Sequence, residues 1–170
     1  MSEPISIAIW VNGQEQRRQV EPRMHLVDFL REELGLRTVR VGCEHGVCGA
    51  CTVRLDGEIV RGCLILAAQA QGHEVETVDH ASDRDDLSDL QRAFHARNAL
   101  QCGFCTTGML LTAAALLEEK PDATRAEVRE YMSGNYCRCT GYHAIIDAIC
   151  DVLQQRRAAA ATRSIQALQP

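Results

Sequence analysis

The cysteine pattern between residues 42 and 63 constrains the fold more than any other part of the chain. Three cysteines are spaced C-x4-C-x2-C, and a fourth follows after eleven more residues; they are Cys43, Cys48, Cys51 and Cys63. Four thiolates in this spacing are typical of a plant-type [2Fe–2S] cluster. Gly42, Gly46 and Gly49 suit such a loop, because glycine lets the backbone turn tightly and approach the sulfurs closely. The sequence therefore predicts a [2Fe–2S] site in this segment.

Other cysteine chemistries agree less well with this spacing. Structural zinc usually takes two short cysteine knuckles, and only one C-x2-C is present in this segment. Disulfides belong mainly to secreted proteins, and nothing marks this chain as secreted. A Rieske centre needs two histidine ligands, and only His45 lies near these cysteines. We expect His45 to be a loop residue and not a ligand.

Composition narrows the classes of function. The chain has 170 residues, a net charge of −5 and nine cysteines. It carries no basic tract, which argues against nucleic acid and anionic membranes as partners. No apolar run approaches the roughly 18 residues of a membrane span, and no signal peptide or twin-arginine leader is visible, so we expect a cytoplasmic protein. Nine cysteines in such a protein indicate metal or redox chemistry.

Hydrophobic periodicity and turn residues predict mixed strands and helices in the N-terminal half. The elements, in order, are strands at 5–11 and 14–20, a helix at 25–34, strands at 52–55 and 58–60, a short helix at 64–70 and a strand at 74–78. Asn12-Gly13 and Asp56-Gly57 are strong hairpin signals, and Gly35 is placed to end the first helix. This order matches a β-grasp layout, for which the resemblance to ferredoxins supplies the strand pairing.

The second half is predicted to be helical. A polar, acidic segment from His80 to Asp86 marks the expected boundary between domains at 1–80 and 81–157. Helices are expected around Leu87–Phe94, at 106–119, from a capping box at Thr124 to Met132, and at 143–153. Four helices of this length indicate a compact bundle. Residues 158–170 lack useful periodicity and are expected to be a mobile or partner-bound tail. The fold class is therefore α+β, a β-grasp domain followed by an all-α domain.

A second set of four cysteines lies in the helical half. Cys102 and Cys105 form a C-x2-C pair, and Cys137 and Cys139 form a C-x-C pair. Both pairs precede predicted helices, whose N-termini favour anionic groups. Spacing alone leaves two possibilities open here, a second iron–sulfur cluster or a tetrahedral zinc site.

Three motifs, taken together, resemble the small iron–sulfur subunit of molybdenum hydroxylases, the family of xanthine oxidase and carbon monoxide dehydrogenase. The resemblance covers residues 3 to about 155 and rests on Gly42-Cys43-Glu44-His45-Gly46-Val47-Cys48-Gly49-Ala50-Cys51-Thr52, on Gln101-Cys102-Gly103-Phe104-Cys105 and on Gly134-Asn135-Tyr136-Cys137-Arg138-Cys139-Thr140-Gly141-Tyr142. It implies a second [2Fe–2S] cluster held by Cys102, Cys105, Cys137 and Cys139. It also implies that Gln101 and Cys139 lie beside the pterin of a molybdenum cofactor, which a large partner subunit carries.

The same resemblance implies a function and an assembly. The chain is expected to pass electrons from the molybdenum cofactor through two [2Fe–2S] clusters to FAD on a medium subunit, in a dimer of heterotrimers. Alternatives are a two-subunit enzyme that reduces a cytochrome, a free-standing ferredoxin-type carrier, and a zinc-stapled interaction module. No phosphate-binding loop appears, so no flavin or nicotinamide is expected in this chain. No acid, base or nucleophile constellation is present, and we assign no catalytic residue.

Two further residues carry expectations. Thr107 stands where the family commonly has proline, which is expected to loosen the first turn of the helix at 106–119, because proline pre-sets φ there. Cys150 lies mid-helix beside Ile146 and Leu153 and is expected to be a small buried hydrophobe.

Overall fold

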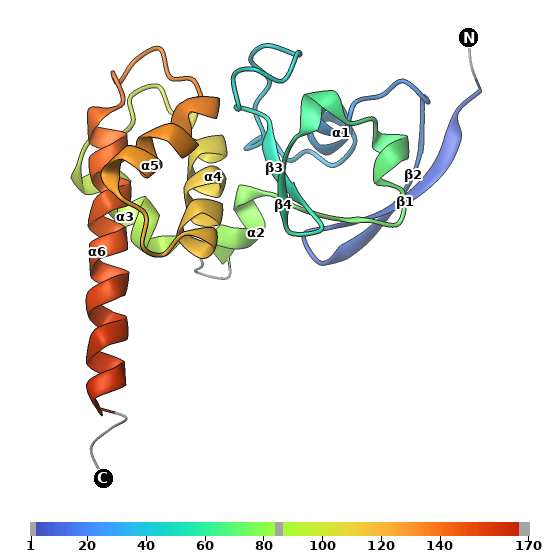
Figure 1. The fold of residues 1–170 in the computed structure, drawn as a ribbon. Helices are drawn as coiled ribbons and strands as arrows, with labels where there is room; N and C mark the ends of the chain where they lie inside the picture. Colours follow the sequence, from blue (N-terminus) through green and yellow to red (C-terminus); the bar gives the residue numbers. More distant parts are fainter. Residues whose placement is uncertain (1–2, 84–86, 167–170) are drawn as a thin grey trace.

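A five-stranded mixed sheet forms the N-terminal part of the computed structural model, which describes residues 3–83 and 87–166 (Figure 1). The strands follow the order β2-β1-β5-β3-β4 and are β1 (Ile5–Val11), β2 (Gln14–Val20), β3 (Thr52–Leu55), β4 (Glu58–Arg61) and β5 (Glu74–Glu76). Strands β1 and β5 are parallel, and the other neighbours are antiparallel. Both predicted hairpins are present, and Asn12, Gly13, Asp56 and Gly57 all have positive φ, as a type I′ turn requires.

One helical segment covers this sheet. It begins as α1 (Leu26–Asp28), continues as a π-helical turn, η1 (Phe29–Glu33), and ends before Gly35, whose φ is +71°. Its apolar residues are buried together with the inward-facing residues of β1, β3 and β5. The β-grasp arrangement predicted for this half is confirmed.

The short helix predicted at 64–70 is replaced by two 3₁₀ turns. These are η2 (Gly62–Leu64) and η3 (Ala67–Ala70). Between them the backbone of residues 65–67 bonds to the start of α1: Leu26 N–H donates to Ile65 C=O at 2.7 Å, and Ala67 N–H donates to Met24 C=O at 2.8 Å. These groups are therefore used in a tertiary contact and cannot form the continuous i to i−4 ladder of an α-helix.

Helices make up the second part of the chain. They are α2 (Val78–Asp83), α3 (Ser88–Ala96), α4 (Thr106–Glu119), α5 (Arg125–Tyr131) and α6 (His143–Gln166), with a 3₁₀ turn η4 (Met132–Gly134) after α5. The four predicted helices are confirmed. Helix α2 was not predicted. It forms where a strand end and a polar boundary were expected, because Val78 and Ala81 are buried in the helical core. Residues 84–86 of that polar segment lie outside the described residues, and the division at residue 80 stays a prediction.

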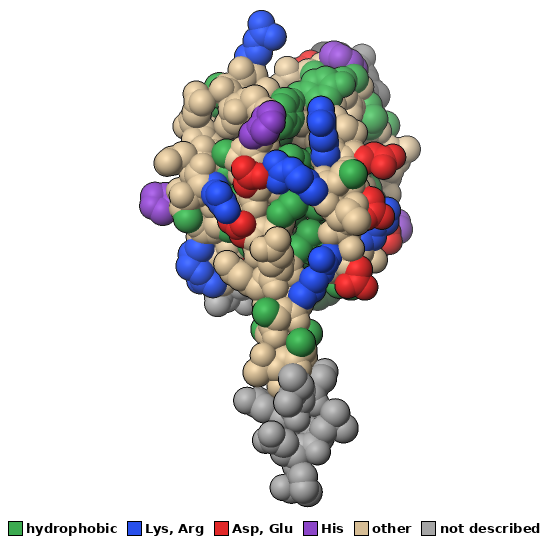
Figure 2. Space-filling view, turned by 60° about the vertical axis from the view of Figure 1, so that its left-hand side comes forward, with side chains coloured by type: hydrophobic (Ala, Val, Ile, Leu, Met, Phe, Trp, Pro, Cys, Tyr) green, Lys and Arg blue, Asp and Glu red, His purple; other side chains and the backbone are tan. Residues whose placement is uncertain are grey.

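Helix α6 continues well beyond its predicted end at Leu153. Arg157 explains part of the extension, since its guanidinium donates to the carbonyls of Pro121 at 2.8 Å and Ala123 at 2.9 Å. The alanines at 158–161 then continue the helix, because alanine has the highest helix propensity. Residues 158–163 are exposed, and this stretch of α6 projects from the body of the molecule (Figures 1 and 2). Among the described residues, no helix is long and apolar enough to cross a membrane.

The two parts pack against each other along α4. This helix lies against β3 and β4, and its residues from Gly108 to Leu117 are buried. At its N-terminal end, a Cβ on Gly108 would collide with the carbonyl oxygen of Gly49. At its C-terminal end, Arg54 Nη2 forms an ion pair with Glu118 Oε1 at 2.7 Å. The close approach at Gly108 brings the first cysteine loop against the helical part.

Candidate metal centres

The first cysteine quartet lies in the loop between η1 and β3 and in η2. Cys51 and Cys63 are buried, whereas Cys43 and Cys48 are half-buried, and all four are free thiols. The loop turns through positive φ at Glu44, Gly46 and Gly49. Such turns point successive backbone N–H groups toward the inside of the loop, which suits an anionic centre.

Local hydrogen bonds distinguish the thiols of this quartet. The N–H of Cys48 donates to Cys43 Sγ at 3.4 Å, and backbone N–H groups of Cys48 and then His45 lower the pKa of Cys43 to about 6. Burial instead raises the pKa of Cys51 to about 12. A thiolate at that depth needs a neighbouring cation to be stable, and a bound metal supplies one. His45 is an exposed loop residue whose ring nitrogen contacts the Cys43 carbonyl.

The second quartet joins two loops of the helical part. Cys105 is the N-cap of α4, and Cys137 and Cys139 lie in the loop before α6, so both pairs precede helices as predicted. Cys102 and Cys139 are exposed, and their Sγ atoms are 3.7 Å apart. Burial raises the pKa of Cys105 to about 12. The sequence pattern thus brings residues of widely separated loops together at one site.

Within each quartet the thiols act on one another in twos. Besides burial, the neighbouring Cys43 raises the pKa of Cys48, Cys63 raises that of Cys51 and Cys137 raises that of Cys105, and Cys102 and Cys139 are in direct contact. A zinc ion would need four thiolates about 2.3 Å from one point. In the part of the chain that the structure describes, no group of three or more Cys, His, Asp or Glu side chains is gathered closely enough to hold a metal ion. A [2Fe–2S] cluster spreads its four thiolates over two irons, with two thiolates on each.

Three residues around the second quartet were not assigned roles from the sequence. Thr140 Oγ1 donates to Cys137 Sγ at 3.1 Å, and the N–H of Cys137 donates to the hydroxyl of Tyr142 at 2.8 Å. Asn135 is 1% exposed and bonds across to the first cysteine loop. All three belong to the Gly134–Tyr142 motif, but sequence spacing gives no direction for a side chain.

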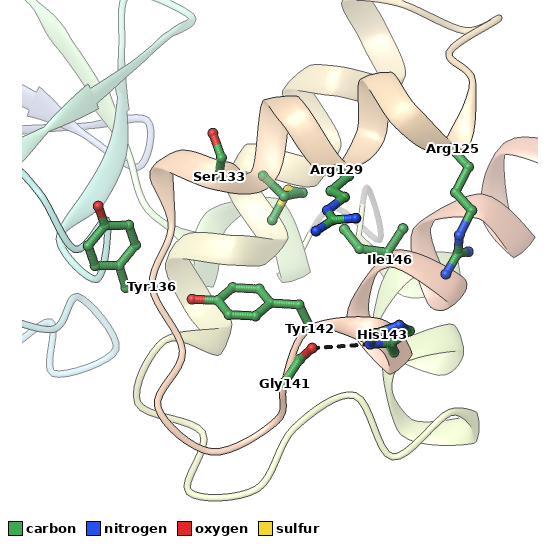
Figure 3. A pocket seen from close by; sticks show the side chains of 9 residues that line it. Arg125, Arg129, Ser133, Tyr136, Gly141, Tyr142, His143 and Ile146 are labelled. Atoms are coloured by element: carbon green, nitrogen blue, oxygen red, sulfur yellow. Dashed lines mark hydrogen bonds between the residues drawn. The ribbon is translucent and has the colours of Figure 1, made fainter.

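Tyr142 also forms a wall of an apolar hollow beside this quartet (Figure 3). The cavity has a volume of about 360 Å³ and lies between α5 and the start of α6. Arg129 and His143 stand at its rim, and His143 Nδ1 lies 3.3 Å from the Gly141 carbonyl oxygen. The cavity contains none of the cysteines.

Gln101 and Cys139 lie side by side at the surface of the second quartet. Gln101 Nε2 donates to the carbonyl of Cys139 at 3.0 Å, and both side chains are exposed. Leu100 and Phe104 on either side are 38% and 43% exposed. The second quartet therefore reaches the surface with apolar side chains around it.

The two quartets meet at a narrow junction. The N–H of Tyr136 donates to the carbonyl of Cys48 at 2.8 Å, and the Phe104 ring lies 3.5 Å from the position of a Cβ on Gly42. The guanidinium of Arg40 is 5.9 Å from the Phe104 ring centroid, and its Nε is buried with no partner among the described residues.

Thr107 helps to hold this junction. Helix α4 begins at Thr106, as predicted, and Thr107 Oγ1 donates to the carbonyl of Thr38 at 3.0 Å. The Thr107 hydroxyl thus gains a bond to the N-terminal part that proline could not make, and its expected effect on the first turn stays a prediction. Cys150 is half-buried against the helical core, and burial raises its pKa, in agreement with a packing role.

Comparison with known proteins agrees with this geometry. Residues 9–77 match the family described as "2Fe-2S iron-sulfur cluster binding domain", and residues 76–150 match the "[2Fe-2S] binding domain". The small subunit of nicotine 6-hydroxylase from Paenarthrobacter nicotinovorans is 50% identical over 150 residues, which cover 88% of this chain and 90% of that protein. Subunit gamma of caffeine dehydrogenase from Pseudomonas sp. (strain CBB1) is 51% identical over 149 residues, covering 86% and 89%.

A solved structure extends the similarity to three dimensions. A chain of quinoline 2-oxidoreductase from Pseudomonas putida 86 superposes with a TM-score of 0.83 at 50% identity, covering 92% of this chain and 98% of that one. The similarity thus extends over both parts of this chain and over nearly the whole length of each of these relatives. The chain belongs to the family of small iron–sulfur, electron-transfer subunits of molybdenum-containing hydroxylases and dehydrogenases.

Proposed function

We propose that this chain holds two [2Fe–2S] clusters and conducts electrons from a molybdenum cofactor in a large partner subunit to FAD in a medium subunit. The observation that carries the proposal is the gathering of eight free cysteines into two quartets whose loops are joined by a backbone hydrogen bond, from Tyr136 N–H to the carbonyl of Cys48. Clusters of this kind supply one-electron storage, while the protein supplies position and electrostatics. The loops that carry the two quartets adjoin each other, which supports electron transfer between the two sites within this chain.

Electrons enter at the second quartet. Its exposed thiols, Cys102 and Cys139, would leave a cluster open to solvent in the isolated chain. A partner that covers this surface excludes water, and Gln101 offers it both a donor and an acceptor. The edge of a pterin carries both hydrogen-bond donors and acceptors, so it needs a partner that can both accept and donate. This supports Gln101 and Cys139 as the residues nearest to the molybdenum cofactor of the large subunit.

Electrons leave at the first quartet. Val47 and Leu64 flank it and are 43% and 60% exposed. Gly46 lies directly beneath the Leu64 side chain, so this apolar rim is continuous with the cysteine loop. Exposed apolar side chains rimmed by polar residues mark protein interaction sites. We assign this rim to the subunit that accepts the electrons.

The substrate of the complex binds in another chain. Relatives at about 50% identity carry names that refer to nicotine and caffeine, and the matched structure is named for quinoline. These are nitrogen heterocycles, which supports a nitrogen heterocycle as the substrate class of this complex.

Metal and cofactor analysis tests the proposal. We expect the purified chain to be brown, to contain about four irons, to be reduced by dithionite with two paramagnetic resonance signals, and to turn over no heterocycle alone. The complex purified through this chain should contain molybdenum and FAD. A colourless zinc protein would contradict the cluster assignment. Substrate turnover by the single chain would contradict its role as a subunit, and a complex without flavin would favour a cytochrome as acceptor.

A further inference from the structure

One backbone hydrogen bond completes a bonded connection between the two cysteine quartets. The N–H of Tyr136 donates to the carbonyl of Cys48 at 2.8 Å. Cys48 belongs to the first quartet, and Tyr136 directly precedes Cys137 of the second. A continuous path therefore runs from Cys48 Sγ along its own backbone, across this hydrogen bond, and through Tyr136 to Cys137 Sγ. In Figure 3 the ring of Tyr136 lies on the side of its loop nearest to the N-terminal part.

Asn135 forms a second bond directly beside this one. Its Nδ2 donates to the carbonyl of Gly49 at 3.2 Å, across 86 residues of sequence. Since Gly49 follows Cys48 and Asn135 precedes Tyr136, the two bonds join neighbouring residues on both loops. The Asn135 side chain is 1% exposed, so water does not compete for its amide.

Arg61 fixes the orientation of the Asn135 amide. Arg61 Nη2 donates to the carbonyl of Gly134 at 2.8 Å and lies 3.5 Å from Asn135 Oδ1. An arginine can only donate and a carbonyl oxygen can only accept. The Asn135 oxygen must therefore face Arg61 and its nitrogen must face Gly49. Buried amides satisfied on both sides in this way hold one conformation.

We propose that Asn135 is a positioning residue for electron transfer between the two sites, acting by holding the Tyr136 N–H on the Cys48 carbonyl. This inference rests on the proposed function. One electron leaves the site of Cys137, which is oxidised, and reaches the site of Cys48, which is reduced. No bond forms or breaks and no proton moves. A route through covalent bonds and one short hydrogen bond couples the two sites more strongly than a gap would.

The test uses the full chain with both clusters and two variants of Asn135. Asn135→Ala removes the bond to Gly49, whose carbonyl keeps the bonds from Thr52 N at 3.3 Å and Thr52 Oγ1 at 2.7 Å. Asn135→Asp keeps the shape and an acceptor for Arg61 but places a carboxylate against the Gly49 carbonyl. We expect both variants to retain wild-type iron content. We also expect a reduced magnetic splitting between the two reduced clusters and slower redistribution of an electron after partial reduction by dithionite.

Arg54→Ala is the matched control. It also removes a contact between the two parts, the 2.7 Å ion pair with Glu118, but at the end of α4 away from the cysteine loops. We expect it to keep the wild-type splitting and redistribution rate, which separates loss of the bridge from general loosening of the interface.

The outcomes divide clearly. Wild-type splitting and rate in both Asn135 variants would overturn the inference, and so would an equal loss in Arg54→Ala. Loss of a cluster from both Asn135 variants would also overturn it, because Asn135 would then act in assembly. A wild-type chain without four irons would instead refute the proposed function, so the two failures are distinguishable.

Discussion

Replacing Gly49 by alanine tests how closely the first cysteine loop is enclosed by the helical part. A Cβ on Gly49 would lie 2.6 Å from Asn135 Nδ2 and 2.8 Å from the carbonyl oxygen of Gly134. Gly134 contributes backbone, which cannot rotate away. The φ of Gly49 is +74°, a conformation that also disfavours any side chain. Two separate penalties therefore apply to this substitution.

The expected cost follows from adding these penalties. An L-residue in the left-handed region costs roughly 1–2 kcal/mol, and overpacking a closed site costs about 1–3 kcal/mol. Gly49→Ala should therefore destabilise the protein by about 2–5 kcal/mol. For a chain of this size, 1 kcal/mol lowers the unfolding temperature by roughly 2–4 °C. We expect the unfolding temperature to decrease by about 4–20 °C, which is the destabilisation multiplied by the decrease per kcal/mol.

Thermal unfolding of the cluster-loaded chain measures this decrease, with Gly57→Ala as the control. Gly57 has a φ of +87°, but a Cβ there would meet nothing within 4 Å, so only the conformational penalty of about 1–2 kcal/mol applies. Adding Asn135→Ala to Gly49→Ala should relieve part of the overpacking, as expected for two residues in contact. Equal decreases for Gly49→Ala and Gly57→Ala would refute the close packing described here.

Three further predictions concern single sites. Cys48→Ser should lower the iron content from about four to about two per chain and remove one of two paramagnetic resonance signals; loss of both would argue against independent sites. Gln101→Ala should leave both clusters assembled but slow their reduction by substrate, and not by dithionite, in the complete complex; a wild-type rate with full molybdenum content would exclude Gln101 from the cofactor interface. The hydrogen bond from Arg97 lowers the pKa of Asp151. The stability that this ion pair contributes is therefore fully present above the ordinary carboxyl pKa near 4, and it is lost as pH falls through the lowered pKa. The difference in unfolding temperature between wild type and Arg97→Ala should therefore shrink below about pH 4, and a difference that persisted there would contradict this assignment.

Elements specified by neighbouring residues were predictable. The capping box at Thr124 and Glu127 forms as expected, with Thr124 N–H donating to Glu127 Oε2 at 2.8 Å and Glu127 N–H donating to Thr124 Oγ1 at 3.3 Å. Helix α4 has the predicted limits, because Thr106 follows the cysteine loop and Pro121 stops the helix. In each case the deciding contacts lie within a few residues of sequence.

Elements specified by distant partners were not predictable. Helix α2 forms because Val78 and Ala81 find apolar partners in the helical core, whereas its own sequence is polar. The segment at 64–70 is held as two 3₁₀ turns by bonds to residues 24–26. Helix α6 extends past Leu153 with Arg157 bonded to the loop before α5. The hydrophobic periodicity within each segment gives no information on these contacts with distant residues.

The candidate sites divide in the same way. The sequence by itself determined which cysteines belong to each quartet, because ligand spacing is a local property of the loops. Only the tertiary structure decided which thiols face each other, such as Cys102 and Cys139 with Sγ atoms 3.7 Å apart, and how closely the quartets approach. The bond between Asn135 and Gly49 joins residues 86 positions apart, and it depends on α4 packing against β3 and β4. A chain's sequence lists such residues separately, and only folding brings their donors and acceptors within bonding distance.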